Sequence, residues 1–331
     1  MDGRGRGVVT TYAVDEKGLW PNMVRVGSRV YSGPADLGFT PARRVSFDGL
    51  VHGADVSASG IEDKRFDYYG AYGDGYGSRA VTTDGYNGAS SCCEMTIKAG
   101  MTGRRGDGQP GTMGDFGGGF TFPVSTFVKN EPFWLGVRVK PVGNVDWSTD
   151  TGSLKFLRVG QTNLAQDLHG KMEFQIKSPT EDGIQDGWMM NNEVSAISQE
   201  NSRIDSDRLI VNDQWNWVEI YINPSDVPSE CVGRIWVGDQ LVCERTGGNH
   251  NKWYENGDWN ESDFLFSETQ KWLVDEAHFI NGLMLFTYWN DGAASDEIVR
   301  LQEVVVHDNP VDLTAVDEFG NKMIGSTANF I

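Results

Sequence analysis

The sequence is poor in the residues that build several common kinds of site. Its four cysteines include no CxxC pair, and no two of its five histidines have metal-ligand spacing, so a zinc site is disfavoured. No apolar run approaches the roughly 18 residues that a membrane-spanning helix needs, which predicts no membrane insertion. Basic residues are outnumbered, with 28 Lys and Arg against 47 Asp and Glu and a net charge of −19. This balance disfavours nucleic acids and anionic membrane surfaces as partners.

A signal peptide is also missing from the start of the sequence. The first seven residues carry two arginines, but no apolar stretch follows them. Earlier removal of a signal would explain this, and so would a route that needs none, such as release of a virus particle by cell lysis. We therefore expect an extracellular or virion-surface protein.

The sequence does contain enough apolar material for a large core. Hydrophobic residues make up 39% of the 331, with 11 Trp, 16 Phe and 10 Tyr, which excludes a wholly disordered chain. Residues 1–88 are rich in Gly, Tyr, Asp and Ser and predict an irregular N-terminal arm. This arm either wraps the main domain or is an assembly segment ordered by a neighbour. Residues 89–310 form the strand-rich domain, and residues 311–331 form a C-terminal tail.

The strands of residues 89–310 show a period of two. In residues 171–177, Met172, Phe174 and Ile176 point to one face and are expected in the core. The even-numbered residues of 217–223 repeat the pattern. Further strands are expected at residues 94–99, 133–140, 154–159, 234–237, 240–244, 282–289 and 299–307, and a single helix at residues 268–278.

Many amphipathic antiparallel strands with Gly-rich connections predict an all-β fold, an antiparallel jelly-roll β-sandwich. Each strand buries one face and turns the other to solvent or to a ligand. We expect the odd-numbered side chains of residues 171–177 and 217–223 to line one accessible, curved surface. Such a surface suits an extended polymer.

Two cysteines flank a predicted β-hairpin that turns at Gly-Asp, residues 238–239. Counting back from the turn places Cys243 opposite Arg234 rather than opposite Cys231. A disulfide bridge between the two cysteines would need a bulge or a shifted register. We therefore expect free, partly buried thiols.

Six sequence segments follow one another between residues 88 and 310. They are Ile-Lys-Ala-Gly at 97–100, Phe-Trp-Leu-Gly-Val-Arg-Val-Lys at 133–140, Leu-Lys-Phe-Leu-Arg at 154–158, Trp-Val-Glu-Ile-Tyr-Ile-Asn at 217–223, Gly-Arg-Ile-Trp-Val-Gly-Asp-Gln-Leu-Val at 233–242, and Leu-Met-Leu-Phe-Thr-Tyr-Trp at 283–289. This order resembles the concanavalin-like jelly roll of polysaccharide lyases of the alginate and glucuronan lyase type, over about two-thirds of the chain. The ExDxE strand motif of jelly-roll glucan hydrolases is absent, which disfavours a two-carboxylate glycosidase.

The resemblance implies a chemistry that the residues can be tested against. A lyase that cleaves a uronic-acid polymer must neutralise the carboxylate, abstract the C5 proton and protonate the leaving oxygen. Arg138 and Lys177 can neutralise, Gln175 can hydrogen-bond a carboxylate, and Tyr221 or Tyr288 can exchange protons. The same residue types occur on any solvated sheet face.

Aromatic side chains provide a second set of candidates, because their planes can stack on sugar rings. For Trp217 this role is favoured over a core role, since its neighbours Val218 and Ile220 already take the core face. The candidate glycan-binding residues are Trp134, Trp217, Tyr221 and Trp289.

Two features oppose a polyanionic substrate. Glu173 and Glu219 fall on the same expected face as the candidate residues, and the whole chain is acidic. Acidic residues 182–186 and 258–263 offer possible structural Ca²⁺ ligands, but neither segment has EF-hand spacing and a solvated turn is favoured. No other cofactor is expected.

Three functions remain open. The leading hypothesis is a non-catalytic, glycan-contacting or structural jelly-roll protein of an extracellular assembly, such as a phage or virus decoration or fibre protein. The second is a polysaccharide lyase acting by β-elimination, and the third is a secreted carbohydrate-binding module. The expected partners are a polysaccharide or glycan and other subunits of a particle or homo-oligomer.

Overall fold

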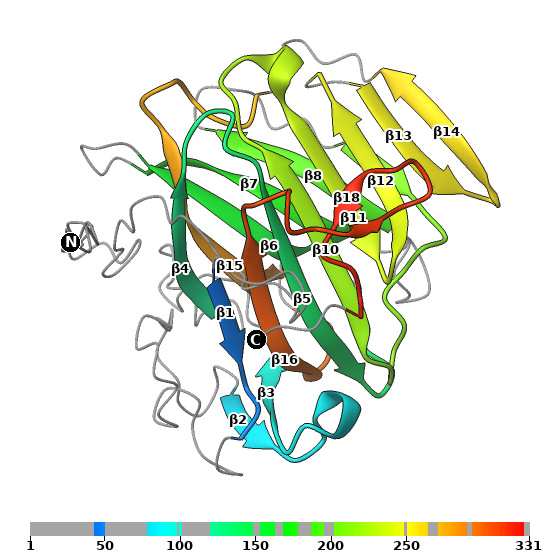
Figure 1. Cartoon of the computed structure of the whole chain (residues 1–331). Helices are drawn as coiled ribbons and strands as arrows, with labels where there is room; N and C mark the ends of the chain where they lie inside the picture. The colour runs from blue at the N-terminus through cyan, green and yellow to red at the C-terminus, as the bar shows by residue number, and fades with distance from the viewer. Residues whose placement is uncertain are drawn as a thin grey trace, which may run out of the picture.

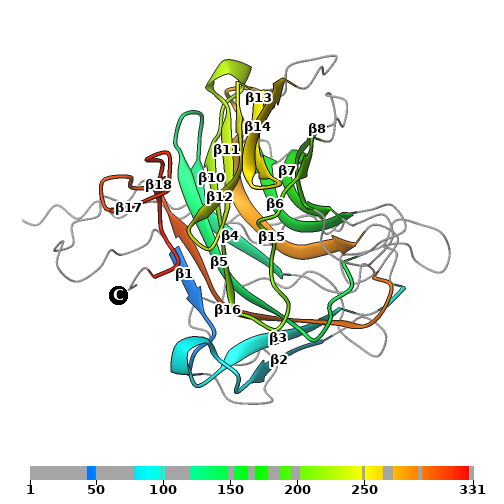
Figure 2. The same cartoon turned by 90° about the vertical axis from the view of Figure 1, so that its right-hand side faces the viewer.

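The computed structural model describes residues 43–49, 78–97, 99–100, 120–147, 153–162, 168–177, 187–194, 202–247, 250–263, 271–289 and 293–327. In these residues the chain forms two antiparallel β-sheets packed face to face (Figures 1 and 2). The predicted all-β sandwich is therefore confirmed. None of the helices in this part of the chain is long and apolar enough to cross a membrane.

The larger sheet contains ten of the described strands. They are β1 (Arg43–Ser46), β2 (Ser78–Thr82), β3 (Cys92–Ile97), β5 (Phe133–Val142), β10 (Asn216–Asn223), β11 (Val232–Val237), β12 (Gln240–Thr246), β13 (His250–Glu255), β14 (Asp258–Asp263) and β16 (Glu297–His307). Their order across the sheet is β14-β13-β12-β11-β10-β5-β16-β3-β2, and β1 also pairs with β16.

The smaller sheet contains six described strands. They are β4 (Phe120–Phe127), β6 (Ser153–Thr162), β7 (Leu168–Lys177), β8 (Gly187–Val194), β9 (Ser202–Asp205) and β15 (Phe279–Trp289). Their order is β4-β15-β6-β7-β8-β9. The remaining described elements are the two-stranded ribbon β17 (Ala315–Val316) and β18 (Lys322–Met323) and the short 3₁₀ turns η1 (Tyr86–Gly88) and η3 (Pro228–Glu230).

The inner faces of the two sheets share one hydrophobic core. The even-numbered side chains of β7 and of β10 are both buried in it, as their alternation predicts. Each large apolar side chain that is fully buried contributes about 1.5–3 kcal/mol, so this shared interface supplies most of the stabilisation of the fold.

The prediction that residues 171–177 and 217–223 line one surface is wrong. Residues 171–177 belong to β7 in the six-stranded sheet, whereas residues 217–223 belong to β10 in the ten-stranded sheet. Both strands bury their even-numbered side chains between the sheets. Glu173 and Gln175 of β7 therefore lie on the opposite side of the sandwich from the odd-numbered side chains of β10. Alternation shows which face of a strand is buried, but it does not show which sheet the strand joins.

The predicted β11–β12 hairpin is present, and Gly238 has a φ of +63°, as the first central residue of a type II′ turn requires. A register shift between Ile235 and Trp236 places Cys243 opposite Ile235 instead of Arg234. All four cysteines are free and buried, which confirms the expected thiols.

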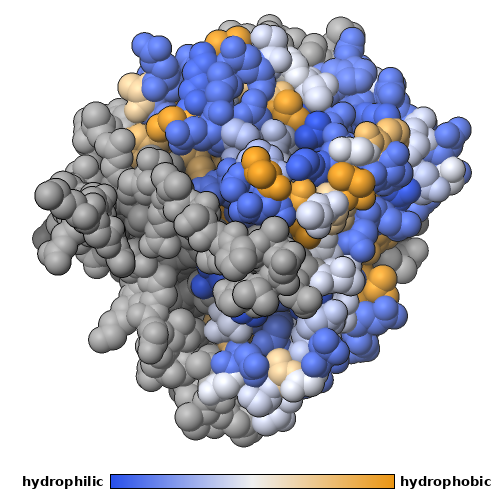
Figure 3. All heavy atoms as spheres, in the orientation of Figure 1, coloured by the Kyte–Doolittle hydropathy of each residue, from blue (hydrophilic) through white to orange (hydrophobic). Residues whose placement is uncertain are grey.

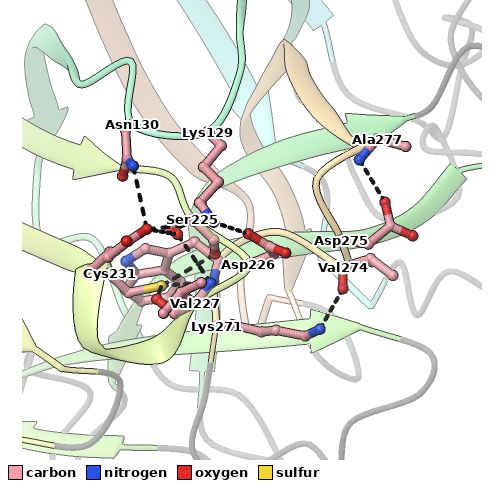
Figure 4. Close-up of polar contacts among 12 residues, drawn as sticks. Lys129, Asn130, Ser225, Asp226, Val227, Cys231, Lys271, Val274, Asp275 and Ala277 are labelled. Carbon is pink, nitrogen blue, oxygen red and sulfur yellow. Dashed lines mark hydrogen bonds and ion pairs between the residues drawn. The ribbon is translucent and has the colours of Figure 1, made fainter.

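The thiol of Cys231 lies in the loop that follows β10 (Figure 4). Its Sγ donates to the carbonyl of Ser225 at 3.2 Å and accepts the backbone N–H of Trp272 at 3.3 Å. The salt bridge between Lys129 and Asp226, 2.8 Å long, holds the same loop against the end of β4. Burial raises the pKa of the Cys231 thiol to about 11.

The predicted helix at residues 268–278 is wrong for the described part, residues 271–278, which forms turns and bends. The backbone N–H groups of Trp272 and Leu273 both donate to the carbonyl of Ser225 in another loop. The carboxylate of Asp275 accepts the N–H of Ala277 at 2.8 Å (Figure 4). Such side-chain-to-backbone bonds compete with helical hydrogen bonds.

The last described residues cover the outer face of the ten-stranded sheet. We call residues 308–327 the C-terminal strap; it includes β17 and β18 and is the red segment in front of the sheet in Figure 1. Leu313 and Ile324 of the strap pack on Trp134, Trp217 and Val305 of the sheet. The expected C-terminal tail is thus integrated into the fold.

We expect the four thiols to react only after unfolding, because all four are buried and out of reach of a reagent in water. Titration with a disulfide dye should detect no fast-reacting thiol in the native protein and four per chain in guanidinium. A native thiol that reacts at the rate of a free peptide thiol would contradict this packing.

Candidate functional site

The residues predicted to form one site lie on opposite faces of the sandwich. The ten-stranded sheet carries Trp134, Arg138, Trp217 and Tyr221, and the six-stranded sheet carries Gln175, Lys177, Tyr288 and Trp289. The proposed set is therefore divided, and each group has to be considered with its own neighbours.

The two candidate tryptophans of the ten-stranded sheet, Trp134 and Trp217, turn away from the core, as predicted, but they are covered. Trp217 is 2% exposed beneath Leu313 and Ile324 of the strap. The indole Nε1 of Trp134 donates to the carbonyl of Lys322 at 2.8 Å. The expectation that these rings are open to sugars is therefore wrong, because a distant segment of the chain occupies their surface.

Arg138 is fully engaged within the protein. Its Nε donates to Oε1 of Glu303 at 3.1 Å, and a terminal nitrogen donates to the carbonyl of Ser326 at 2.8 Å. Its guanidinium also lies over the rings of Tyr86 and Trp217, at 3.9 and 4.8 Å from their centroids. A buried cation with these partners cannot serve a uronate carboxylate.

Tyr221 is half-buried at the edge of the strap. Its ring lies 4.9 Å from that of Trp134, and the guanidinium of Arg234 lies 5.0 Å from its centroid. Burial raises the pKa of the Tyr221 phenol above its ordinary value, although Arg234 acts in the opposite direction. A raised pKa keeps the phenol protonated and makes it harder to recruit as a base.

A polar network lies on the outer face of the six-stranded sheet. Oε1 of Glu173 accepts the Nζ of Lys155 at 2.9 Å and the Nε of Arg158 at 2.7 Å. Its Oε2 accepts the Nε2 of Gln175 at 2.7 Å. We call these four residues the Glu173 network. Of the sequence candidates, only Gln175 belongs to it.

A β-bulge brings the two cations of this network together. Lys155 and Arg158 are three residues apart, so a regular strand would place them on opposite faces. The pairing of β6 with β7 shifts register between Lys155 and Leu157. Phe156 and Leu157 consequently both enter the core, and the cations share the outer face. No pattern in the sequence marks this bulge. The face of the sheet on which Lys155 lies therefore cannot be predicted from the sequence.

The strand register places a predicted tyrosine in the same row as the network. Tyr288 on β15 is paired with Lys155 on β6, and Lys155 is paired with Gln175 on β7. Lys177 is paired with Ser153, and Trp289 with Leu154. The six-stranded sheet thus gathers more of the lyase candidates than the ten-stranded sheet does.

The Glu173 network contains two cations and one carboxylate, and each of these groups also has contacts with other residues. Lys155 is its most accessible charged side chain, with 10% exposure against 5% for Arg158 and none for Glu173. Salt screens charges beyond about 10 Å, so a local excess of positive charge can hold a carboxylate on a protein that is acidic overall. A ligand carboxylate would meet this network through Lys155.

Metal ligands are not gathered in the described residues, where no group of three His, Cys, Asp or Glu side chains could hold an ion. Acidic residues 258–263 form the edge strand β14 instead of a binding loop, and residues 182–186 lie outside the described residues. Of the histidines in the described residues, His278 in the loop before β15 and His307 at the end of β16 are both buried.

Comparison with known proteins shows the fold of the chain. No family model and no curated protein matches it. Among solved structures, a marine alginate lyase of Aplysia kurodai is 12% identical with a TM-score of 0.52, over 82% of this chain and 100% of that one. An endo-β-1,4-glucuronan lyase of the fungus Trichoderma reesei is 11% identical with a TM-score of 0.48, over 80% and 97%. An alginate lyase of a Chlorella virus is 11% identical with a TM-score of 0.47, over 79% and 100%.

The protein therefore has the same fold as the Aplysia kurodai alginate lyase, the concanavalin-like jelly roll that the order of its segments predicted. At these identities the likeness concerns the fold alone. Function has to be argued from the side chains.

Replacing Glu173 should destabilise the fold, because it would leave the two buried cations of the network without their shared carboxylate. Glu173→Gln is expected to lower the free energy of unfolding by about 3–5 kcal/mol. Denaturant titration measures this loss. The control is Glu244→Gln, which breaks the more accessible Arg234–Glu244 pair and should cost less than about 1 kcal/mol. An equal loss of unfolding free energy in the two variants would contradict the role of Glu173 as the carboxylate shared by two buried cations.

Proposed function

We propose that this protein binds a polysaccharide containing uronic acid through the outer face of its six-stranded sheet, without cleaving it. The observation that supports this most directly is the Glu173 network, in which Lys155 and Arg158 are fixed by one carboxylate. Lys155 is the more accessible of the two cations, and because it is already ordered, a ligand carboxylate that reaches it would cost little side-chain entropy.

Binding is favoured over catalysis by the positions and partners of the other candidate catalytic residues. Arg138 is occupied by Glu303, and Tyr221 lies on the opposite side of the sandwich from Gln175. A β-elimination needs a neutralising group and a proton-transfer group around one sugar ring. The set built on Tyr221 and Arg138 does not meet that requirement together with Gln175 and Lys177.

The proposal includes an extracellular or particle-surface location and contact there with other copies of the chain or other subunits, because polymers of uronic acids are found outside cells. The acidic composition supports it in one respect, since a net charge of −19 keeps the protein from adhering to nucleic acids. Retention by the polymer is therefore expected to depend on the local network rather than on overall charge.

Lys155→Met tests the binding site, because methionine keeps the length of the side chain and removes its charge. Loss of one charge-assisted contact, about 1.5–3 kcal/mol, should weaken binding to alginate or glucuronan roughly 10- to 100-fold. Isothermal titration calorimetry measures the change. The matched control is Lys140→Met, which removes a lysine paired with Asp84 on the other sheet and should leave binding unchanged.

The binding proposal fails if neither polymer is bound, or if Lys140→Met weakens binding as much as Lys155→Met does. Melting temperatures of both variants should accompany the titrations, so that unfolding is not mistaken for loss of the site. A site elsewhere on the acidic surface would make the two lysines equivalent.

The second candidate function is a polysaccharide lyase, and the register of Tyr288 favours it. Tyr288 is paired with Lys155, so a proton-transfer group and a cation occupy one row of the six-stranded sheet. If the protein cleaves alginate or glucuronan, absorbance at roughly 235 nm should rise, because elimination leaves a conjugated enol-uronate that absorbs there. Tyr288→Phe should abolish the rise and Tyr221→Phe should leave it intact; the reverse result would place the chemistry on the ten-stranded sheet.

A further inference from the structure

One tripeptide of the sequence matches the acceptor pattern for an N-linked glycan, which is Asn-X-Ser or Asn-X-Thr with any residue except proline in the middle. It is Asn260-Glu261-Ser262. Asn223-Pro224-Ser225 has the same outer residues, but its proline excludes it. The sequence therefore offers a single acceptor asparagine.

The acceptor tripeptide lies in β14, the last strand in the order of the ten-stranded sheet. Hydrogen bonds join β14 to β13 on one side, and no other strand of the described residues pairs with it. β14 lies at the outer edge of the molecule in Figure 1, and the same edge is mostly hydrophilic in Figure 3. A large branch on an edge strand can extend into water without separating two strands of the sheet.

The side chain of Asn260 is partly exposed and is not engaged within the protein. Its amide makes no hydrogen bond to any of the described residues. Asn223 of the excluded tripeptide differs, because its Nδ2 donates to the carbonyl of Glu230 at 2.8 Å. A glycan joined to Asn260 would therefore displace no hydrogen bond of the described structure.

The serine of the tripeptide is also accessible. Ser262 is exposed, and its hydroxyl donates to the carbonyl of Asp263 at 3.4 Å, which is long for a hydrogen bond. Residues two apart on a strand lie on the same face, so Ser262 and Asn260 share one face of β14. The two side chains that define the acceptor pattern are thus accessible together.

An aromatic ring lies beside the acceptor. Trp253 of β13 is paired directly with Asn260, which places the two side chains on the same face. The ring is only partly buried against the core, and its Nε1 donates to the carboxylate of Glu255 at 3.0 Å. The first sugar on Asn260 can pack its apolar face against the part of this ring that the core leaves uncovered.

We propose that Asn260 carries an N-linked glycan when the chain passes through a secretory pathway that contains an oligosaccharyltransferase. The free amide of Asn260, the exposed Ser262 and the open edge of β14 support the assignment. It rests on the extracellular location included in the proposed function, and it is independent of the binding of any polymer.

The modification transfers an oligosaccharide from a lipid diphosphate to the protein. Nδ2 of Asn260 forms a bond to the anomeric carbon of the first sugar and gives up one proton to a base of the transferase. The bond between that carbon and the diphosphate oxygen breaks, and the lipid diphosphate leaves with the electron pair. The transfer needs no oxidant or reductant.

Translation of the full chain, preceded by a cleavable signal peptide, into endoplasmic reticulum microsomes tests the acceptor. Only chains that the microsomal membrane protects from added protease are scored, so that failure to enter the lumen is not counted. Most of these chains should run as one heavier band on a denaturing gel, and a peptide N-glycosidase should remove the shift. Asn260→Gln and Ser262→Ala should abolish it, whereas Ser262→Thr keeps the hydroxyl and should preserve it. Asn223→Gln is the matched control and should leave the shift unchanged.

Protected chains without the heavier band would overturn the proposal, and so would a shift that persists in Asn260→Gln. Folding supplies a second test, because a glycan on a side chain without a hydrogen-bond partner in the described residues should not impair it. The glycosylated chain secreted from insect cells should melt at a temperature no lower than that of Asn260→Gln from the same cells. A glycosylated chain that is unfolded while Asn260→Gln is folded would contradict the accessible position of Asn260. Calorimetry with alginate or glucuronan decides polymer binding separately, so failure of the proposed function cannot be mistaken for failure of this site.

Discussion

A carboxylate removed from water must be compensated by cations or by hydrogen-bond donors, because desolvation otherwise favours the neutral acid. The outer faces of this sandwich are both organised around a fully buried glutamate under that constraint. Glu173 is compensated by Lys155 and Arg158, and it thereby fixes two cations on the six-stranded sheet. Glu219 is held by indole and backbone N–H groups, and it thereby fixes a chain segment on the ten-stranded sheet. One residue type therefore orders a polar network on one side and holds a covering segment on the other.

The two surfaces explain why a familiar fold says little about activity here. The shared core sets the positions of the strands, and the alternating apolar residues are enough to form it. The outward side chains are free to differ as long as their polar atoms are paired. Gly136 shows that the outer face of the ten-stranded sheet is closely packed around its own side chains, since a Cβ there would lie 2.1 Å from the ring of Trp217.

Local patterns in the sequence predict the strands well and their assembly poorly. The alternation in residues 171–177 and 217–223 identifies the buried side chains correctly, because burial of one face is a property of the single strand. The sheet to which a strand belongs is not a property of the single strand, because β7 and β10 are joined to their sheets by pairing with other segments of the chain. The outward direction of Trp217 could be predicted in the same way, but its cover by Leu313 and Ile324 could not, because it depends on residues almost a hundred positions away.

The site was only partly predictable for a related reason. Gln175 follows from alternation, whereas Lys155 and Arg158 share a face only through the bulge at Phe156. The prediction that glutamates would repel a uronate treated Glu173 as an isolated charge. In the folded protein its charge is offset by the two cations that it orders, so Glu173 does not act as an isolated negative charge.

The same pairing bears on the choice between binding and cleavage. Elimination requires stabilisation that grows as charge moves from the sugar carbon onto its carboxylate. The positive charge of Lys155 and Arg158 is already shared with Glu173, which weakens its response to that developing charge. Attraction for a ground-state carboxylate remains through Lys155, the most accessible of the three charged groups. Interactions that favour the ground state and the transition state equally give affinity without acceleration, and this is the sense in which the network is better suited to hold a uronate than to transform it.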